Sequence, residues 1–357
     1  MSLTKVVGNG HMQSRSIVLK TAIRHLVERS LGRLPLRMLL RASGLRTLQV
    51  FYHKSHHADP VYFRQGYAVK SPEQFEAEID YLLQRLVPVT LEQLLAAKSD
   101  QDLPEGSFFL SFDDGYRELA EIISPILQRK GVPATFFICS SLIDNKNWLF
   151  EDQIGLVLSR VRGLSQADIA ACESQCLQPH GLTFSSLRRI RVPPAKALLE
   201  LGEFLRIDWD TELAQHRPYL TSEQIHGLLR NGFSIGAHGI DHTVFESLSL
   251  DEQLRQIDES CRAVAEQFDL RYRAFAFPYG EFGVNRELLL RVRREKLIDC
   301  LFGTRGLVID EFEPWLRQRL WCEGHAGTFE SHLRSQLGAA VLRHWRGRNV
   351  VNRRHQG

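Results

Sequence analysis

Short, strongly apolar segments alternate with helical patterns along most of this 357-residue chain. The apolar segments cover residues 48–52, 107–112, 134–138, 233–237 and 274–277, and their aromatic and branched side chains are typical of buried strands. Capped helical patterns follow, for example after Ser71 and Thr221. Because strands that alternate with helices build parallel βα units, we expect an α/β fold on a parallel sheet.

The alternation stops over residues 142–218, which contain polar helical segments and a Pro193-Pro194 break. We interpret this stretch as a helical insertion into the main domain. The predicted organisation is therefore a basic N-terminal arm (1–46), a main domain (47–327) that carries the insertion, and a C-terminal helix with a basic tail (328–357).

The positive charges gather at the two ends of the chain, although the net charge is only +3. Residues 14–46 hold eight Lys or Arg against one acid, Glu28, and residues 334–357 hold six Arg and no acid. The arm is amphipathic, so it either touches an anionic membrane surface or packs on the main domain with a solvated arginine face. We expect no nucleic-acid partner, and the oligomeric state stays open.

Nothing in the sequence predicts export. No apolar run approaches the ~20 residues of a membrane span, and no signal peptide is evident. The six cysteines are scattered, and Cys172-x3-Cys176 lacks a second pair at zinc-finger spacing, so reduced thiols are expected. We therefore expect a cytoplasmic protein, peripheral at the inner face of the membrane if the arm binds lipid.

The strand at 107–112 ends in two adjacent carboxylates and a glycine, Asp113-Asp114-Gly115. An Asp in this position can simply cap the following helix. Alternatively, the two carboxylates diverge as the chain leaves the strand, so that one holds a metal while the other faces substrate or water. Both interpretations remain open from this segment alone.

Two later strands end in comparable polar clusters. His238-Gly239-Ile240-Asp241-His242 follows residues 233–237, and Pro278-Tyr279-Gly280 follows residues 274–277. The carboxyl ends of parallel strands share one rim, so the three clusters are expected to meet there. Two histidines at i, i+4 with one Asp would leave open positions on Zn²⁺, which is the layout of a catalytic site.

Taken in order, Ser-Phe-Asp-Asp-Gly, His-Gly-Ile-Asp-His and Phe-Pro-Tyr-Gly resemble the motifs of the polysaccharide deacetylases, the NodB-homology carbohydrate esterases. The resemblance covers roughly residues 48–320 without the insertion. Residues 51–104 also resemble the circularly permuted branch that includes the bacterial poly-N-acetylglucosamine deacetylases. The resemblance implies a distorted (β/α)₇ barrel that removes N- or O-acetyl groups from sugars with a divalent metal, zinc being the first choice.

Residue roles are implied by the same resemblance. Asp114, His238 and His242 take the positions of the metal ligands, and Asp113 takes that of the general base. The backbone N–H of Tyr279 takes the position of an oxyanion donor.

The sequence departs from the family pattern in its third motif. The arginine that usually stands two residues before the proline is replaced by Ala276, and we choose Arg319 as the substitute that steadies the base.

A second departure concerns the general acid, because no Leu-x-His motif is evident near the C-terminal end. The permuted branch supplies this histidine from an N-terminal Tyr-His, so we expect His53 to protonate the leaving group. His325 and His332 are the alternatives.

The predicted function is deacetylation of an acetylated sugar in the synthesis of a cell-surface polysaccharide or glycolipid. Two other functions stay open: a non-catalytic carbohydrate-binding pseudoenzyme, because of Ala276, and an amidohydrolase of a small non-sugar amide. Trp148, Trp315 and Trp321 either stack on sugar rings or pack in the core, and we favour packing for each.

Overall fold

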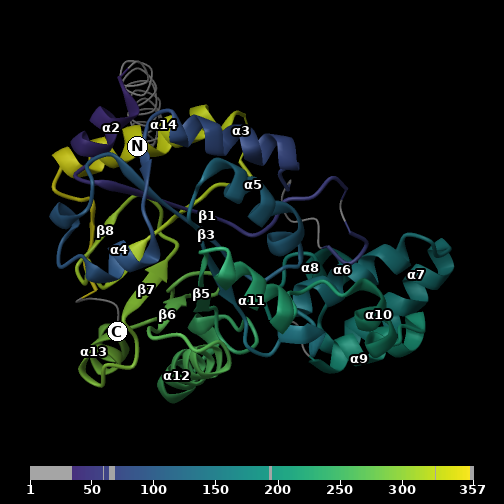
Figure 1. Cartoon of the computed structure of the whole chain (residues 1–357). Coiled ribbons are helices and arrows are strands. Elements are labelled where there is room, and N and C mark those ends of the chain that lie inside the picture. Colours follow the sequence, from purple (N-terminus) through teal and green to yellow (C-terminus); the bar gives the residue numbers. More distant parts are fainter. Residues whose placement is uncertain (1–33, 59, 64–68, 193–194, 326, 354–357) are drawn as a thin grey trace, which may run out of the picture.

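The computed structural model of the chain describes residues 34–58, 60–63, 69–192, 195–325 and 327–353. Within them, the predicted α/β fold is confirmed: neighbouring strands of the main sheet pair in parallel, and helices cover the outside of the sheet (Figure 1). Most of the predicted membrane-binding arm, residues 14–33, lies outside the described residues.

The main sheet is a nearly closed barrel with the strand order β10-β1-β3-β4-β5-β6-β7-β9, and β2 pairs with β3. Its strands are β1 (Thr47–Tyr52), β2 (Val87–Pro88), β3 (Ser107–Phe112), β4 (Thr135–Ile138), β5 (Ser234–Ala237), β6 (Ala274–Ala276), β7 (Cys300–Gly303), β9 (Leu316–Gln318) and β10 (Leu320–Trp321). The segment 316–321 closes the barrel, because β9 pairs with β7 and, one residue later, β10 pairs with β1.

Helices pack on the outside of the barrel (Figure 1). They are α2 (Leu36–Ala42), α3 (Pro72–Leu83), α4 (Leu91–Ala96), α5 (Ser124–Lys130), α11 (Ser222–Arg230), α12 (Leu250–Gln267), α13 (Arg286–Arg294) and α14 (Phe329–Trp345). The capping boxes predicted at Ser71 and Thr221 are present and begin α3 and α11.

Side chains alternate between the two sides of each barrel strand. In β3, Phe108 and Phe112 belong to the core between strands and helices, whereas Phe109 points inward and stacks on Phe302 at 5.2 Å. Asp113 follows the inward series by the same period of two. The alternation therefore aims this carboxylate into the mouth of the barrel.

The inside of the barrel is packed with side chains. A Cβ added to Gly236 in β5 would lie 2.5 Å from the Phe137 ring and 2.9 Å from the carbonyl oxygen of Ala274. A glycine is therefore required where these strands approach, and side chains fill the interior at this level of the barrel.

The predicted helical insertion forms a lobe beside the barrel (teal in Figure 1). It consists of α6 (Phe150–Val161), α7 (Gln166–Cys172), α8 (Phe184–Leu187), α9 (Ala195–Leu205) and α10 (Trp209–His216), with short 3₁₀ and π turns between them. Ile154, Val157, Leu187 and Leu201 are fully buried in a hydrophobic core of its own. The lobe therefore has its own packing and is tied to the barrel at the start of α6.

The described part of the N-terminal arm packs on the barrel. Helix α2 buries Leu36, Leu39 and Leu40 in the main core and lies against α14, while Arg37 and Arg41 are exposed. For residues 34–46 this agrees with the alternative in which the arm packs on the main domain and exposes its arginine face to solvent.

The prediction of a basic tail at the C-terminal end is wrong for Arg353. After α14 the chain forms β11 (Val350–Val351), which pairs with β8 (Ile309–Asp310). Arg353 is fully buried, and its Nη2 donates to Asp310 Oδ2 at 2.8 Å and to Glu281 Oε1 at 3.2 Å. Two buried carboxylates need a cation, which explains why this arginine is inside.

All six cysteines lie among the described residues, and each is buried with a free thiol. Across the described ranges, the search for a helix with the length and apolarity of a bilayer span finds none.

Candidate active site

The three polar clusters meet at the carboxyl end of the barrel, as their positions after parallel strands predicted. Their backbone shares an unusual feature: Asp114, His242 and Tyr279 have φ angles of 74°, 60° and 56°. These are left-handed conformations that residues other than glycine adopt at a cost of about 1–3 kcal/mol each. Such strain gathers at functional sites, where the surrounding fold holds side chains in required directions.

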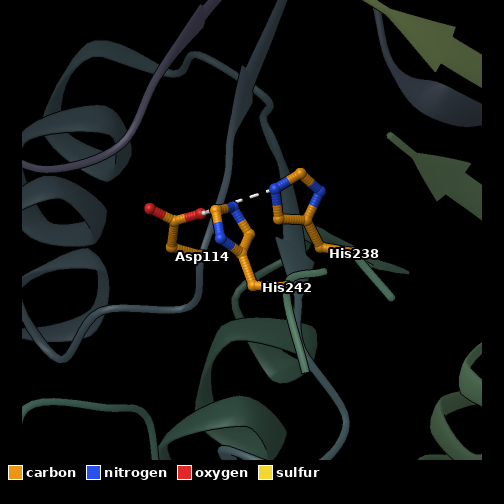
Figure 2. A group of neighbouring side chains, drawn as sticks. All are labelled: Asp114, His238 and His242. Atoms are coloured by element: carbon orange, nitrogen blue, oxygen red, sulfur yellow. Dashed lines mark ion pairs between the residues drawn. The ribbon is translucent and has the colours of Figure 1, made fainter. Parts of the chain in front are cut away.

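Asp114, His238 and His242 converge on one point (Figure 2). Asp114 Oδ1 lies 3.4 Å from His238 Nε2 and 3.2 Å from His242 Nε2. This oxygen is buried, and no described residue gives it a hydrogen bond in good geometry. Among the described residues, these three form the single group of His, Cys, Asp or Glu donors that can hold a metal ion.

The donor set fits a small divalent cation. Ligands at ~2.0–2.1 Å from a tetrahedral zinc lie about 3.3 Å from one another, close to the distances observed here. His238 also donates from Nδ1–H to the carbonyl oxygen of Ala276 at 2.8 Å, which leaves Nε2 directed at Asp114. One carboxylate and two imidazoles leave coordination positions for water and substrate.

The carboxylate of Asp114 is held in its charged form. Burial alone would raise the pKa of Asp114, but the nearby His242 and His53, with His238, outweigh burial and hold this pKa well below its usual range. The carboxylate is therefore ionised and ready to bind.

Asp113 is held by Arg319 through a bidentate ion pair. Arg319 Nη1 donates to Asp113 Oδ1 at 2.7 Å, and Nη2 donates to Oδ2 at 2.8 Å, with both side chains buried. Arg319 also donates to Ser111 Oγ at 3.0 Å. It lies between β9 and β10, so the segment that closes the barrel supplies the guanidinium to the site.

His53 lies at the end of β1 and is fixed by a carboxylate that the sequence did not suggest. Its Nδ1 is 2.5 Å from Glu323 Oε2, and its backbone N–H donates to the same oxygen at 3.0 Å. Burial favours the neutral ring, but Glu323, with Asp114 and Asp113, raises the pKa of His53 to about 9. The imidazole is therefore protonated at neutral pH.

These residues open onto one cavity of about 570 Å³. Its lining includes all the predicted site residues except Arg319, which contacts the cavity only through its ion pair with Asp113. Tyr279 lies on the wall with its ring centroid 4.6 Å from that of His242. The volume of the cavity is large enough for a sugar unit, because small-molecule sites usually have volumes of about 300–1,000 Å³.

Other candidates from the sequence lie elsewhere. His325 and His332 stack on each other with centroids 4.2 Å apart, and neither lines the cavity. Trp148 and Trp315 donate from their indole N–H to backbone carbonyls and pack against the cores, as expected. Trp321 differs, because it lines the cavity and is 37% exposed.

Two carboxylates of the site were missed. Glu323 follows β10 after one residue, Cys322, but β10 has only two residues and gave no strand pattern. Glu151 lines the cavity from the first turn of α6, where an acid is ordinarily explained by the helix dipole. Only the folded structure shows that Glu323 faces His53 and that Glu151 faces His242.

Comparison with known proteins identifies the family. The model of the family "Polysaccharide deacetylase" matches residues 100–295, more than half of the chain. The chain therefore belongs to the polysaccharide deacetylases, which are metal-dependent hydrolases. No curated protein sequence matches it significantly.

Solved structures share the fold. The Streptococcus pyogenes deacetylase PplD in complex with acetate is 15% identical, with a TM-score of 0.53 over 82% of this chain and 98% of that one. IcaB from Ammonifex degensii is 16% identical, with a TM-score of 0.52 over 83% and 97%. A de-N-acetylase from Aggregatibacter actinomycetemcomitans is 14% identical, with a TM-score of 0.51 over 81% and 99%.

The geometry predicts different outcomes for the two adjacent carboxylates. Asp114→Ala removes one of three donors, so zinc affinity should fall by more than the ~10–100-fold caused by loss of an outer partner. Asp113→Asn should bind zinc as the unaltered protein does. Chelator competition measures both constants, and equal loss of affinity in the two variants would contradict the separation of their roles.

Proposed function

We propose that this deacetylase acts on an N- or O-acetylated sugar during synthesis of a cell-surface polysaccharide or glycolipid, with zinc as its metal. The observation that carries the proposal is that the Asp114–His238–His242 cluster, Asp113 with its partner Arg319, and His53 with its partner Glu323 meet at one cavity. Together they supply a metal site, a base and an acid.

Asp114, His238 and His242 would hold a divalent cation, which would supply polarisation of the acetyl carbonyl and of the attacking water. Asp113, steadied by Arg319, accepts the proton of that water. The backbone N–H of Tyr279 donates to the oxyanion that develops on the carbonyl oxygen when water adds to the carbonyl carbon. His53 then gives its proton to the leaving amine or alkoxide, and Glu323 balances the charge of the ring before that step.

The sugar would lie along the cavity wall beside Trp321. The exposed indole offers a flat apolar face, and its N–H donates to Glu323 Oε2 at 3.1 Å, which fixes the ring. Aromatic faces of this kind suit the apolar side of a pyranose ring. The insertion contributes Arg189 and Arg191 to the cavity lining, so it would shape which saccharides fit.

The two alternative functions lose support from the site. The pseudoenzyme hypothesis was motivated by Ala276, yet a guanidinium contacts the carboxylate of Asp113 all the same, supplied by Arg319. A small non-sugar amide would leave much of the 570 Å³ cavity unfilled. A substrate panel distinguishes it from a saccharide.

Acetate release tests the proposal directly. Protein loaded with Zn²⁺ or Co²⁺ should release acetate from at least one substrate in a panel of N-acetyl and O-acetyl saccharides. Asp113→Asn should lower kcat by about 10²–10⁴-fold, the usual contribution of a general base. Stoichiometric metal binding without acetate release from any saccharide would contradict the proposed activity.

Glu323→Gln tests the proposed acid through the pH profile. The charged groups facing His53 are Glu323, Asp114 and Asp113. Since Glu323 raises the pKa of His53, neutralising it should lower this pKa by roughly 1–3 units, the usual effect of one close opposite charge. His53 must be protonated to act, so the alkaline limb of kcat should move to lower pH. Glu105→Gln, which changes an exposed acid that does not line the cavity, is the control, and an unmoved limb would argue against His53.

We further propose that the protein works in the cytoplasm at the inner face of the membrane, touching anionic lipid through residues 14–46. Support comes from the described end of this segment, where Met38 is 54% exposed between exposed Arg37 and Arg41. Basic residues contribute ~1 kcal/mol each at such a surface.

Met38→Glu/Arg41→Glu should therefore weaken co-sedimentation with phosphatidylserine vesicles roughly fivefold or more. Arg230→Glu/Arg294→Glu, which changes exposed arginines of α11 and α13, should have less effect. Equal binding by both double variants would reject contact through this segment.

A further inference from the structure

The insertion reaches the metal-binding cluster through one side chain. Glu151, in the first turn of α6, lies with Oε1 3.4 Å from Nδ1 of His242. Both carboxylate oxygens of Glu151 and this ring nitrogen are buried, and none has a hydrogen-bond partner in good geometry among the described residues. A buried carboxylate and a buried imidazole nitrogen that face each other at this distance need only a small adjustment to form a hydrogen bond.

The first turn of α6 is held rigidly against the barrel. Asp152, the next residue, accepts hydrogen bonds from Tyr116 Oη at 3.2 Å and from Tyr219 Oη at 2.7 Å. Tyr219 Oη in turn accepts from the backbone N–H of Leu149 at 2.8 Å. Tyr116 belongs to the loop that carries Asp114, so Glu151 is positioned by the same loop that supplies the carboxylate donor.

The two histidines are oriented in parallel ways. Each directs Nε2 at Asp114 and has its Nδ1 next to an oxygen acceptor. For His238 that acceptor is the neutral carbonyl of Ala276, which belongs to the barrel. For His242 it is the carboxylate of Glu151, which belongs to the insertion.

We propose that Glu151 is a positioning residue for the metal site. It accepts a hydrogen bond from Nδ1–H of His242, fixes the tautomer in which Nε2 is the donor atom, and makes that nitrogen a stronger ligand. Carboxylates commonly orient metal-bound histidines in this way. The inference rests on the proposed metal site, and it gives the helical insertion a role in the chemistry: the insertion completes the surroundings of a barrel ligand.

Zinc affinity in graded variants tests this role. Glu151→Ala removes both the acceptor and the charge, and should weaken Zn²⁺ binding about 10–100-fold. Glu151→Gln keeps an acceptor oxygen but loses the charge, so its affinity should fall between that variant and the unaltered protein. Glu203→Ala changes an exposed acid on α9 of the same insertion and should bind zinc normally.

The measurement is chelator competition for Zn²⁺, with the visible spectrum of the Co²⁺-loaded protein as a second readout of ligand geometry. Thermal melting of the metal-free variants checks folding, and Glu151→Gln, being isosteric, keeps the test informative if Glu151→Ala does not fold. Unchanged affinity in Glu151→Gln and Glu151→Ala would overturn the proposal. Loss of zinc as complete as in Asp114→Ala would also overturn it, because Glu151 would then be a ligand itself.

The result is independent of the substrate. If the unaltered protein binds zinc and releases no acetate, the proposed activity fails, while the graded order of zinc affinities still decides the role of Glu151.

Discussion

The buried ion pair between Arg319 and Asp113 is the interaction on which the site depends. A carboxylate with almost no exposure is costly unless a cation pairs with it, and breaking such a pair by removing one partner costs about 3–5 kcal/mol. Arg319 can reach Asp113 only because the segment 316–321 passes from β7 to β1 and closes the barrel. The same segment therefore closes the barrel and completes the site.

The period of two along barrel strands accounts for most of the arrangement. Leu48, Val50 and Tyr52 of β1 pack outward, which aims His53 at the interior. The same alternation aims Asp113 inward after β3 and His238 inward after β5. The residues that directly follow strands are thus the proposed base, the proposed acid and one proposed metal ligand, whereas Asp114, His242 and Tyr279 depend on left-handed turns just beyond the strands.

These differences explain what the sequence could predict. The barrel, the insertion and the three clusters were predictable because apolar strands of three to six residues and the polar residues after them form local patterns. Arg319 was predicted only as a replacement for the arginine that is missing at Ala276. The strands on either side of it, β9 and β10, are too short to give a sequence pattern. Glu323 contacts His53 and Glu151 lies next to His242, and each pair is far apart in the sequence. A single acidic residue gives no sequence pattern from which such a partner could be predicted. Arg353 was misjudged as tail because its carboxylate partners are equally distant along the chain.

The central claim is that Asp114, His238 and His242 hold a metal while Asp113 stays outside its coordination shell as the base. The most direct measurement is a crystal structure of the protein with Zn²⁺ and acetate, located by the anomalous signal of zinc. The account predicts a zinc peak within ~2.0–2.2 Å of Asp114 Oδ1 and both histidine Nε2 atoms, with acetate facing the Tyr279 N–H and Asp113 still paired with Arg319. A zinc ion ligated by Asp113, or bound away from this cluster, would contradict it.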